Sequence, residues 1–126
     1  MKYREILRIN EHKREKQTIM GKETPMERIY TTNEIKAKLL PIFVALPVEK
    51  AILFGSYARG TPSRTSDVDI LIDSKGKIRG IDFFGVLEDI TVCLDKRIDL
   101  IERYQIEDSS PIYNTIEQEG IVLYER

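Results

Sequence analysis

Apolar residues between positions 31 and 47 recur at the spacing of an α-helix. One buried helix face is predicted there, formed by Ile35, Leu39, Ile42, Phe43 and Leu46. Thr32 or Asn33 can cap this helix at its start, because either side chain can accept a backbone N–H bond. We expect Pro41 to kink or end the helix, since proline lacks an N–H and crowds the preceding turn. Pro47 closes the segment.

Shorter apolar runs predict four strands. The run 51–54 ends directly at Gly55 and is typical of a buried strand, and residues 55–66 predict a turn, with at most one helical turn, and then a loop. A period of two follows, in which Val68, Ile70 and Ile72 alternate with Asp67, Asp69 and Leu71. This phase places both aspartates on the strand face opposite the apolar one. Residues 98–101 and 121–124 predict the last two strands.

Two further helices are predicted between and after these strands. The first has a face made of Phe83, Phe84, Leu87, Ile90 and Leu94. The second begins at Pro111 after the possible cap Ser110, turns Ile112 and Ile116 inward and ends at Gly120. The sum is an α+β domain with a small mixed β-sheet and flanking helices.

Charge divides the chain into two parts. Residues 1–28 hold eight Lys and Arg against five Asp and Glu, and we interpret them as a basic, helical or flexible N-terminal arm on a domain formed by residues 29–126. The arm can contact an acidic partner or can simply be a solvated helix face. The whole chain carries a net charge of −1, which gives a nucleic-acid partner no support. The sequence lacks a membrane-spanning run and an apolar signal-peptide core, so a cytoplasmic location is expected.

The cysteine and histidine content limits the metal chemistry that is open to this chain. Cys93 is the single cysteine and lies among apolar residues, which is typical of a buried structural thiol. His12, the single histidine, lies in the N-terminal arm. These two residues cannot form a zinc-type ligand set. Any metal must therefore be a hard cation held by carboxylates.

A glycine and a serine directly follow the first predicted strand. Gly55 lets the backbone approach a phosphate closely, because it has no Cβ. The N–H groups of the following turn favour an anion, and the Ser56 hydroxyl can donate one more bond. Taken alone, a Gly-Ser pair is also what an ordinary turn contains.

Three aspartates on two predicted strands are candidate metal ligands. Asp67 and Asp69 lie on one strand face with Cα atoms roughly 6.5 Å apart, and Mg²⁺ suits two such carboxylates because it takes oxygen ligands. Asp99 is unusual in composition, because it lies within an otherwise apolar strand. If that strand pairs with the Asp67–Asp69 strand, three acids can hold two ions, or one ion and a catalytic base. Each acid could instead be an outward-facing polar residue.

The order and spacing of these residues resemble the nucleotidyltransferase superfamily that includes DNA polymerase β. Ten residues separate Ser56 from Asp67, and thirty positions separate Asp69 from Asp99. The run GSYARGTPSRTSDVDILI looks especially like the minimal nucleotidyltransferases, the antitoxin partners of HEPN-domain toxins. The Ala58-Arg59-Gly60 and Ser66-Asp67 segments fit that subgroup, as does the closing stretch from Pro111 to Tyr124 with its EG-IVLY ending. The resemblance covers about residues 31–126 and implies the polymerase β-like fold.

The resemblance also implies a reaction. Gly55 and Ser56 would hold the β- and γ-phosphates of ATP, with Arg59 and Ser66 as further nucleotide-binding candidates. Arg59 could equally be a structural helix residue, and Arg64 and Lys96 are weaker candidates that are more often solvated surface charges. The three aspartates would bind one or two Mg²⁺ ions, or Asp99 would accept the attacking hydroxyl's proton.

The acceptor that the resemblance implies is a tyrosine hydroxyl of a HEPN-type toxin, which would be silenced by AMP. Antibiotic-modifying relatives carry an added helical domain for which residues 1–28 leave no room, and this favours a protein acceptor. A non-catalytic antitoxin that only covers its toxin, and a small-molecule nucleotidyltransferase, are the alternatives. The sequence leaves open whether the protein forms a homo- or hetero-oligomer.

Overall fold

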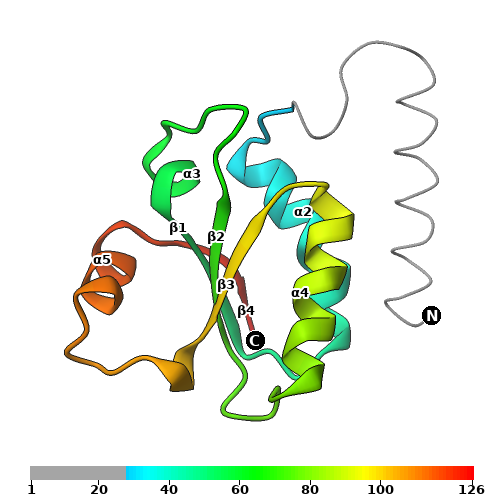
Figure 1. The fold of residues 1–126 in the computed structure, drawn as a ribbon, viewed down its shortest axis with the longest axis vertical. Helices are drawn as coiled ribbons and strands as arrows, with labels where there is room; N and C mark the ends of the chain where they lie inside the picture. Colours follow the sequence, from blue (N-terminus) through cyan, green and yellow to red (C-terminus); the bar gives the residue numbers. More distant parts are fainter. Residues whose placement is uncertain (1–27) are drawn as a thin grey trace.

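The computed structural model describes residues 28–126, so the arm predicted for residues 1–28 lies, except for Arg28, outside the described part. Four strands form one mixed sheet in the order β3-β2-β1-β4 (Figure 1). β1 (Lys50–Phe54) pairs antiparallel with both β2 (Val68–Asp73) and β4 (Ile121–Glu125). β3 (Ile98–Glu102) lies parallel to β2 at one edge of the sheet. The predicted α+β fold with a mixed sheet is confirmed.

Helices cover both faces of the sheet. α2 (Thr32–Ala45) and α4 (Ile81–Leu94) lie together on one face, while α5 (Pro111–Glu119) lies on the other (Figure 1). The short helix α3 (Gly55–Arg59) continues directly from the end of β1, and the 3₁₀ turn η2 (Arg103–Gln105) follows β3. None of the helices in residues 28–126 is long and apolar enough to cross a membrane.

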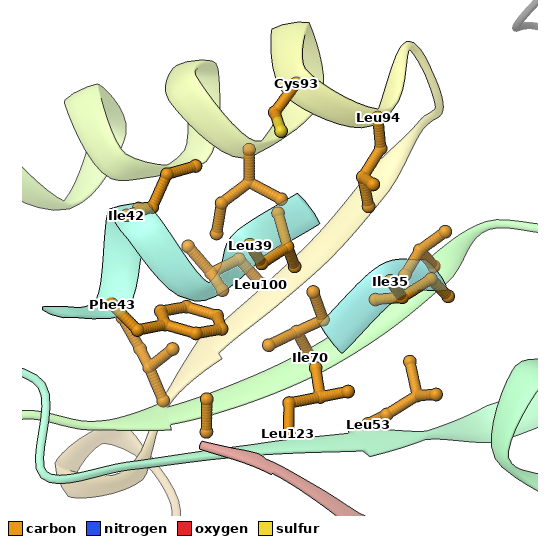
Figure 2. Close-up of a cluster of buried hydrophobic side chains, with 14 of the residues drawn as sticks. Ile35, Leu39, Ile42, Phe43, Leu53, Ile70, Cys93, Leu94, Leu100 and Leu123 are labelled. Carbon is orange, nitrogen blue, oxygen red and sulfur yellow. The ribbon is translucent and has the colours of Figure 1, made fainter. Parts of the chain in front are cut away.

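The main core lies between the sheet and the pair α2 and α4. Alternate β2 residues point into it, because side chains of a strand project to opposite faces in turn. Figure 2 shows side chains from α2, α4 and all four strands meeting there; the labelled ones are Ile35, Leu39, Ile42, Phe43, Leu53, Ile70, Cys93, Leu94, Leu100 and Leu123. Cys93 is buried, as expected, and its thiol donates to the Lys38 carbonyl at 3.4 Å.

A second, smaller apolar cluster lies under α5 on the opposite sheet face. It contains the buried residues Phe54, Leu71 and Ile116, with Ile52, Ile101 and Ile106 packed against them. The two clusters together fix which side chains of β1, β2 and β3 point to which face. A shift of one residue in register would exchange the two faces and expose both clusters.

The start of α2 differs from the prediction. Thr31, and neither Thr32 nor Asn33, is the cap: its hydroxyl accepts from the Glu34 N–H at 3.1 Å, and the Glu34 carboxylate accepts from the Thr31 N–H at 2.9 Å. This reciprocal capping box satisfies two backbone donors at once. The Ser110 position at the start of α5 is as predicted, but its side chain makes no capping bond.

Pro41 does not end α2, which continues to Ala45. The carbonyl that loses its partner belongs to Ala37, an exposed residue, so water can satisfy it. The next two residues, Ile42 and Phe43, are fully buried and hold the last turn of the helix against the core. Burial of these two side chains outweighs the lost hydrogen bond.

Two residues predicted to face inward are exposed. Phe84 is 65% exposed, because the inward face of α4 passes through Val86, Ile90 and Cys93. Ile112 is 38% exposed, because the small cluster under α5 reaches Ile116 but not the first turn of the helix.

Gly120 ends α5 as predicted, but its conformation is not the left-handed one common at helix ends, since its φ is −66°. Space explains the glycine instead. A Cβ at this position would lie 2.3 Å from the Ile116 carbonyl oxygen and 2.5 Å from Cγ2 of Ile52. The chain therefore passes from α5 into β4 in direct contact with β1.

We predict that Gly120→Ala lowers the free energy of unfolding by about 1–3 kcal/mol, because overpacking forces backbone to move. Urea denaturation of the two proteins measures the difference. Gln118→Ala, an exposed change on the same helix, is the matched control and should change stability by less than about 0.5 kcal/mol. A Gly120→Ala variant as stable as the control would show that the junction has room for a side chain.

Candidate active site

The strand register places two of the candidate aspartates side by side. Asp69 of β2 lies opposite Asp99 of the parallel strand β3, and opposite Phe54 of β1 on its other side. Val68 and Ile70 point into the main core, so Asp69 faces the α5 side of the sheet. Asp99 lies on the same face. Both aspartates are at the end of the sheet where β1 ends and where β2 and β3 begin (Figure 1).

The environment of Asp69 is unfavourable for its negative charge. Burial, followed by the carboxylates of Asp99 and Asp67, raises the pKa of Asp69 to about 6. A hydrogen bond with Asp99 acts in the same direction, and the positive charge of Arg59 opposes it. Two further carboxylates and one guanidinium are therefore within electrostatic reach of Asp69.

Asp67 occupies the outer position of this group. It lies immediately before β2, and its Oδ1 is 3.4 Å from Nε of the exposed residue Arg97. The Val68 N–H donates to the Arg97 carbonyl at 2.9 Å, which fixes the backbone next to Asp67. Asp67 is thus ion-paired with Arg97, whereas Asp69 and Asp99 share a hydrogen bond.

The chemistry of this donor set fits a hard divalent cation. Carboxylate oxygens are the ligands that Mg²⁺ prefers, and a cation between these carboxylates would relieve the crowding that raises the pKa of Asp69. Among residues 28–126, no group of three or more His, Cys, Asp or Glu side chains is already gathered as a complete metal cage. Asp69 and Asp99 form the paired part, and Asp67 would have to turn from Arg97 to join them.

Gly55 is in direct contact with this group. Its φ is +71°, and a Cβ built on it would lie 2.0 Å from Oδ2 of Asp69. The glycine is required both by its conformation and by the carboxylate that occupies the space of a side chain. Ser56, the next residue, is half-buried in α3 and its carbonyl accepts from the Thr61 N–H at 3.0 Å. The predicted Gly-Ser pair therefore lies beside the aspartates.

The other two nucleotide-binding candidates differ in position. Arg59 lies in the last turn of α3, close enough to lower the pKa of Asp69. Ser66 closes the loop before Asp67: its hydroxyl accepts from the Ser63 N–H at 2.8 Å. The described contacts of Ser66 are therefore within its own loop.

Two residues near the site have roles that sequence reasoning missed. Lys96 was expected to be a solvated surface charge, but it is only 3% exposed and its ammonium donates to the Arg64 carbonyl at 3.1 Å. It fastens the loop that precedes Asp67. Glu119, at the end of α5, lies with Oε2 at 3.5 Å from Nη1 of Arg59. No local pattern predicts either contact, because each joins segments more than thirty residues apart.

Comparison with known proteins places the chain beside nucleotidyltransferases. The family model described as polymerase beta, nucleotidyltransferase, matches residues 37–126. A protein of Methanocaldococcus jannaschii, with a provisional description as a protein adenylyltransferase, is 39% identical over 70 residues, which are 55% of this chain and 74% of that protein.

Solved structures with the same fold come from toxin–antitoxin complexes. One is a toxin–antitoxin complex with AMP-PNP, for which the TM-score is 0.63 at 22% identity over 72% of this chain and 73% of that chain. Another contains a tri-AMPylated Shewanella oneidensis HEPN toxin with an MNT antitoxin, for which the TM-score is 0.59 at 16% identity, covering 76% and 74%. At these identities the likeness concerns the fold.

The raised pKa of Asp69 predicts how its replacement changes stability with pH. The folded state binds the Asp69 proton more tightly than the unfolded state does, so this carboxyl destabilises the folded protein above about pH 6 and not below about pH 4. We expect Asp69→Asn, in metal-free buffer, to raise the free energy of unfolding at pH 7.5 by about 1 kcal/mol after allowance for solvent screening.

Denaturant unfolding of the variant and the wild-type protein at pH 7.5 and pH 4.5 measures this. The advantage of the variant should shrink as pH falls through 6. Glu88→Gln, an exposed change on α4, is the control and should show no such pH dependence. A variant that is less stable than wild type at pH 7.5 would contradict the crowding of the three acids.

Proposed function

Because this chain belongs to the polymerase beta nucleotidyltransferase family, we propose that it transfers AMP from ATP to a tyrosine hydroxyl of a HEPN-type toxin and so acts as its antitoxin. The observation that carries the proposal is the Asp69–Asp99 pair, with the Asp69 carboxylate against Gly55. A pure binding module has no need for carboxylates crowded around Asp69, since they raise its pKa and the crowding costs stability. A nucleotidyltransferase needs them.

Each residue of the site has a role in this proposal. Gly55 and Ser56 receive the phosphates of ATP on the α3 turn, where no side chain of residue 55 stands in the way. Asp67 and Asp69 would hold Mg²⁺, with Asp99 as a ligand of a second ion. Bound magnesium supplies positive charge that offsets the charge on the triphosphate and on the leaving pyrophosphate.

The transfer breaks one bond and forms one. The tyrosine oxygen bonds to the α-phosphorus, the bond from that phosphorus to the oxygen bridging to the β-phosphate breaks, and pyrophosphate leaves with the electron pair. Asp99 can accept the hydroxyl proton in place of the second-ion role, because it is exposed on an edge strand where an acceptor can approach. Asp69 is only half-exposed, between β1 and β3 in the sheet, and has less access.

The choice of a protein acceptor is supported by two comparisons. The M. jannaschii relative is described provisionally as a protein adenylyltransferase, and the tri-AMPylated toxin is the partner of a chain with this fold. The edge position of β3 adds a structural argument, since the described residues place no further strand beyond Asp99. A large acceptor can therefore reach the site from that side.

We predict that incubation of the protein with its toxin, ATP and Mg²⁺ adds one or more AMP units to a toxin tyrosine, detected by mass spectrometry. Asp69→Asn and Asp67→Asn should each lower the rate by on the order of a hundredfold or more, because each removes negative charge that the ions require. Asp108→Asn, an exposed change remote from the aspartates, is the charge-matched control and should keep the rate.

The outcomes separate the proposal from its alternatives. Tight toxin binding without added mass would replace it with a non-catalytic antitoxin. Pyrophosphate release with a small hydroxylated molecule, and none with toxin, would indicate a small-molecule nucleotidyltransferase. Unchanged transfer by both aspartate variants would move the chemistry elsewhere in the chain.

A further inference from the structure

The Glu119–Arg59 ion pair joins the C-terminal EG-IVLY motif to the acidic end of the sheet. Glu119 is the last residue of α5, and its Oε2 lies 3.5 Å from Nη1 of Arg59 in α3. Arg59 also acts on Asp69, whose pKa it lowers. α3, which begins at Gly55 against the Asp69 carboxylate, thus carries a guanidinium that acts on Asp69 and pairs with the C-terminal motif.

Both members of the pair project from backbone that the core fixes. α3 is closed behind Arg59 by Gly60, with φ +78°, and by the Thr61 N–H, which donates to the Ser56 carbonyl. α5 is held by Ile116, which is buried against Phe54 and Leu71, one turn before Glu119. The close contact of Gly120 with β1 fixes the other side of Glu119. The fold therefore sets where the carboxylate lies relative to Arg59.

The Arg59–Glu119 ion pair contributes little to the stability of the fold. The Arg59 and Glu119 side chains are 49% and 41% exposed, and ion pairs at such exposure contribute little to folding. Orientation is the larger effect, because a guanidinium has five N–H donors in a planar fork. When Glu119 occupies one edge, the other edge remains for phosphate oxygens.

Prior ordering of Arg59 favours nucleotide binding. A free arginine side chain samples many rotamers, and immobilising it when a ligand binds costs conformational entropy. Glu119 restricts that freedom before the nucleotide arrives. Its carboxylate also offsets part of the positive charge of Arg59, but a triphosphate carries several negative charges and remains the stronger partner.

We infer that Glu119 is a positioning residue for the triphosphate: it holds Arg59 beside the Asp69–Asp99 pair so that the guanidinium meets the phosphates of the incoming nucleotide. This inference rests on the proposed nucleotide site and assigns the Glu of the EG-IVLY motif to it. Glu119 acts only through Arg59. The Gly of the motif supplies the close backbone approach that places Glu119.

A double-mutant cycle tests the inference by calorimetry with AMP-PNP and Mg²⁺ as the probe. Glu119→Ala should weaken binding about fivefold, and Arg59→Ala should weaken it at least as much. Combining both changes should weaken binding no further than Arg59→Ala alone, because Glu119 has nothing left to position. Glu119→Asp, which keeps the carboxylate, should restore part of the affinity.

Glu117→Ala is the matched control, since it removes an exposed carboxylate from the same helix and should bind the analogue like wild type. Thermal melts establish that each variant is folded, and Glu119→Gln serves in place of Glu119→Ala if the latter is not. Unchanged binding, tighter binding, or additive losses in the double variant would each overturn the inference.

The toxin assay separates this inference from the proposed function. A wild-type protein that binds AMP-PNP but adds no AMP to toxin would refute the transfer while the cycle still decides the role of Glu119. A protein that transfers AMP and shows an additive cycle would refute only the positioning role. Failure to bind AMP-PNP at all would overturn both.

Discussion

The parallel pairing of β2 with β3 is the constraint on which the site depends. It places Asp69 directly opposite Asp99, so two carboxylates occupy neighbouring positions on one sheet face. Like charges directly opposite each other destabilise a sheet, and here burial adds to the effect. The pairing persists because β2 and β3 also contribute Ile70 and Leu100 to the main core. The core therefore holds together two charges that would otherwise separate.

The two apolar clusters determine which side chains of β2 face which side of the sheet. The main core takes one face of β2, and the cluster under α5 takes Leu71 on the other. Asp69 lies next to that second cluster, which explains why burial is the largest cause of its raised pKa. Phe54 belongs to the same cluster and pairs with Asp69, so the strand that delivers Gly55 ends beside the acids. Phe54 thus both packs in the second cluster and lies beside Asp69.

Periodicity in the sequence was sufficient to predict the strands and the face of β2 that carries Asp69. It left open the β2–β3 pairing that brings Asp99 beside Asp69, and it placed Asp67 within the strand rather than just before it. The alternation around Val68 and Ile70 is a local pattern, and so is the Gly-Ser pair after a buried run. The burial of Lys96 and the pairing of Glu119 with Arg59 were missed, because both depend on contacts between distant segments. Pro41 was misjudged for a related reason: tertiary burial of Ile42 and Phe43 overrides the local preference of proline.

Asp69 and Glu102 lie at opposite ends of the β2–β3 pair, and their surroundings differ in a way that bears on function. At the far end Glu102, fully buried, accepts hydrogen bonds from both the N–H and the hydroxyl of Ser74, so protein donors take over part of the work of water. Asp69 has another carboxyl group as its hydrogen-bond partner. Burial raises the pKa of Glu102 as well, and its Oε2 has no hydrogen-bond partner among residues 28–126, but the two bonds from Ser74 oppose that rise. What separates Asp69 from Glu102 is the kind of neighbour. Two further carboxylates add to the effect of burial on the pKa of Asp69, and a bound cation would relieve that crowding.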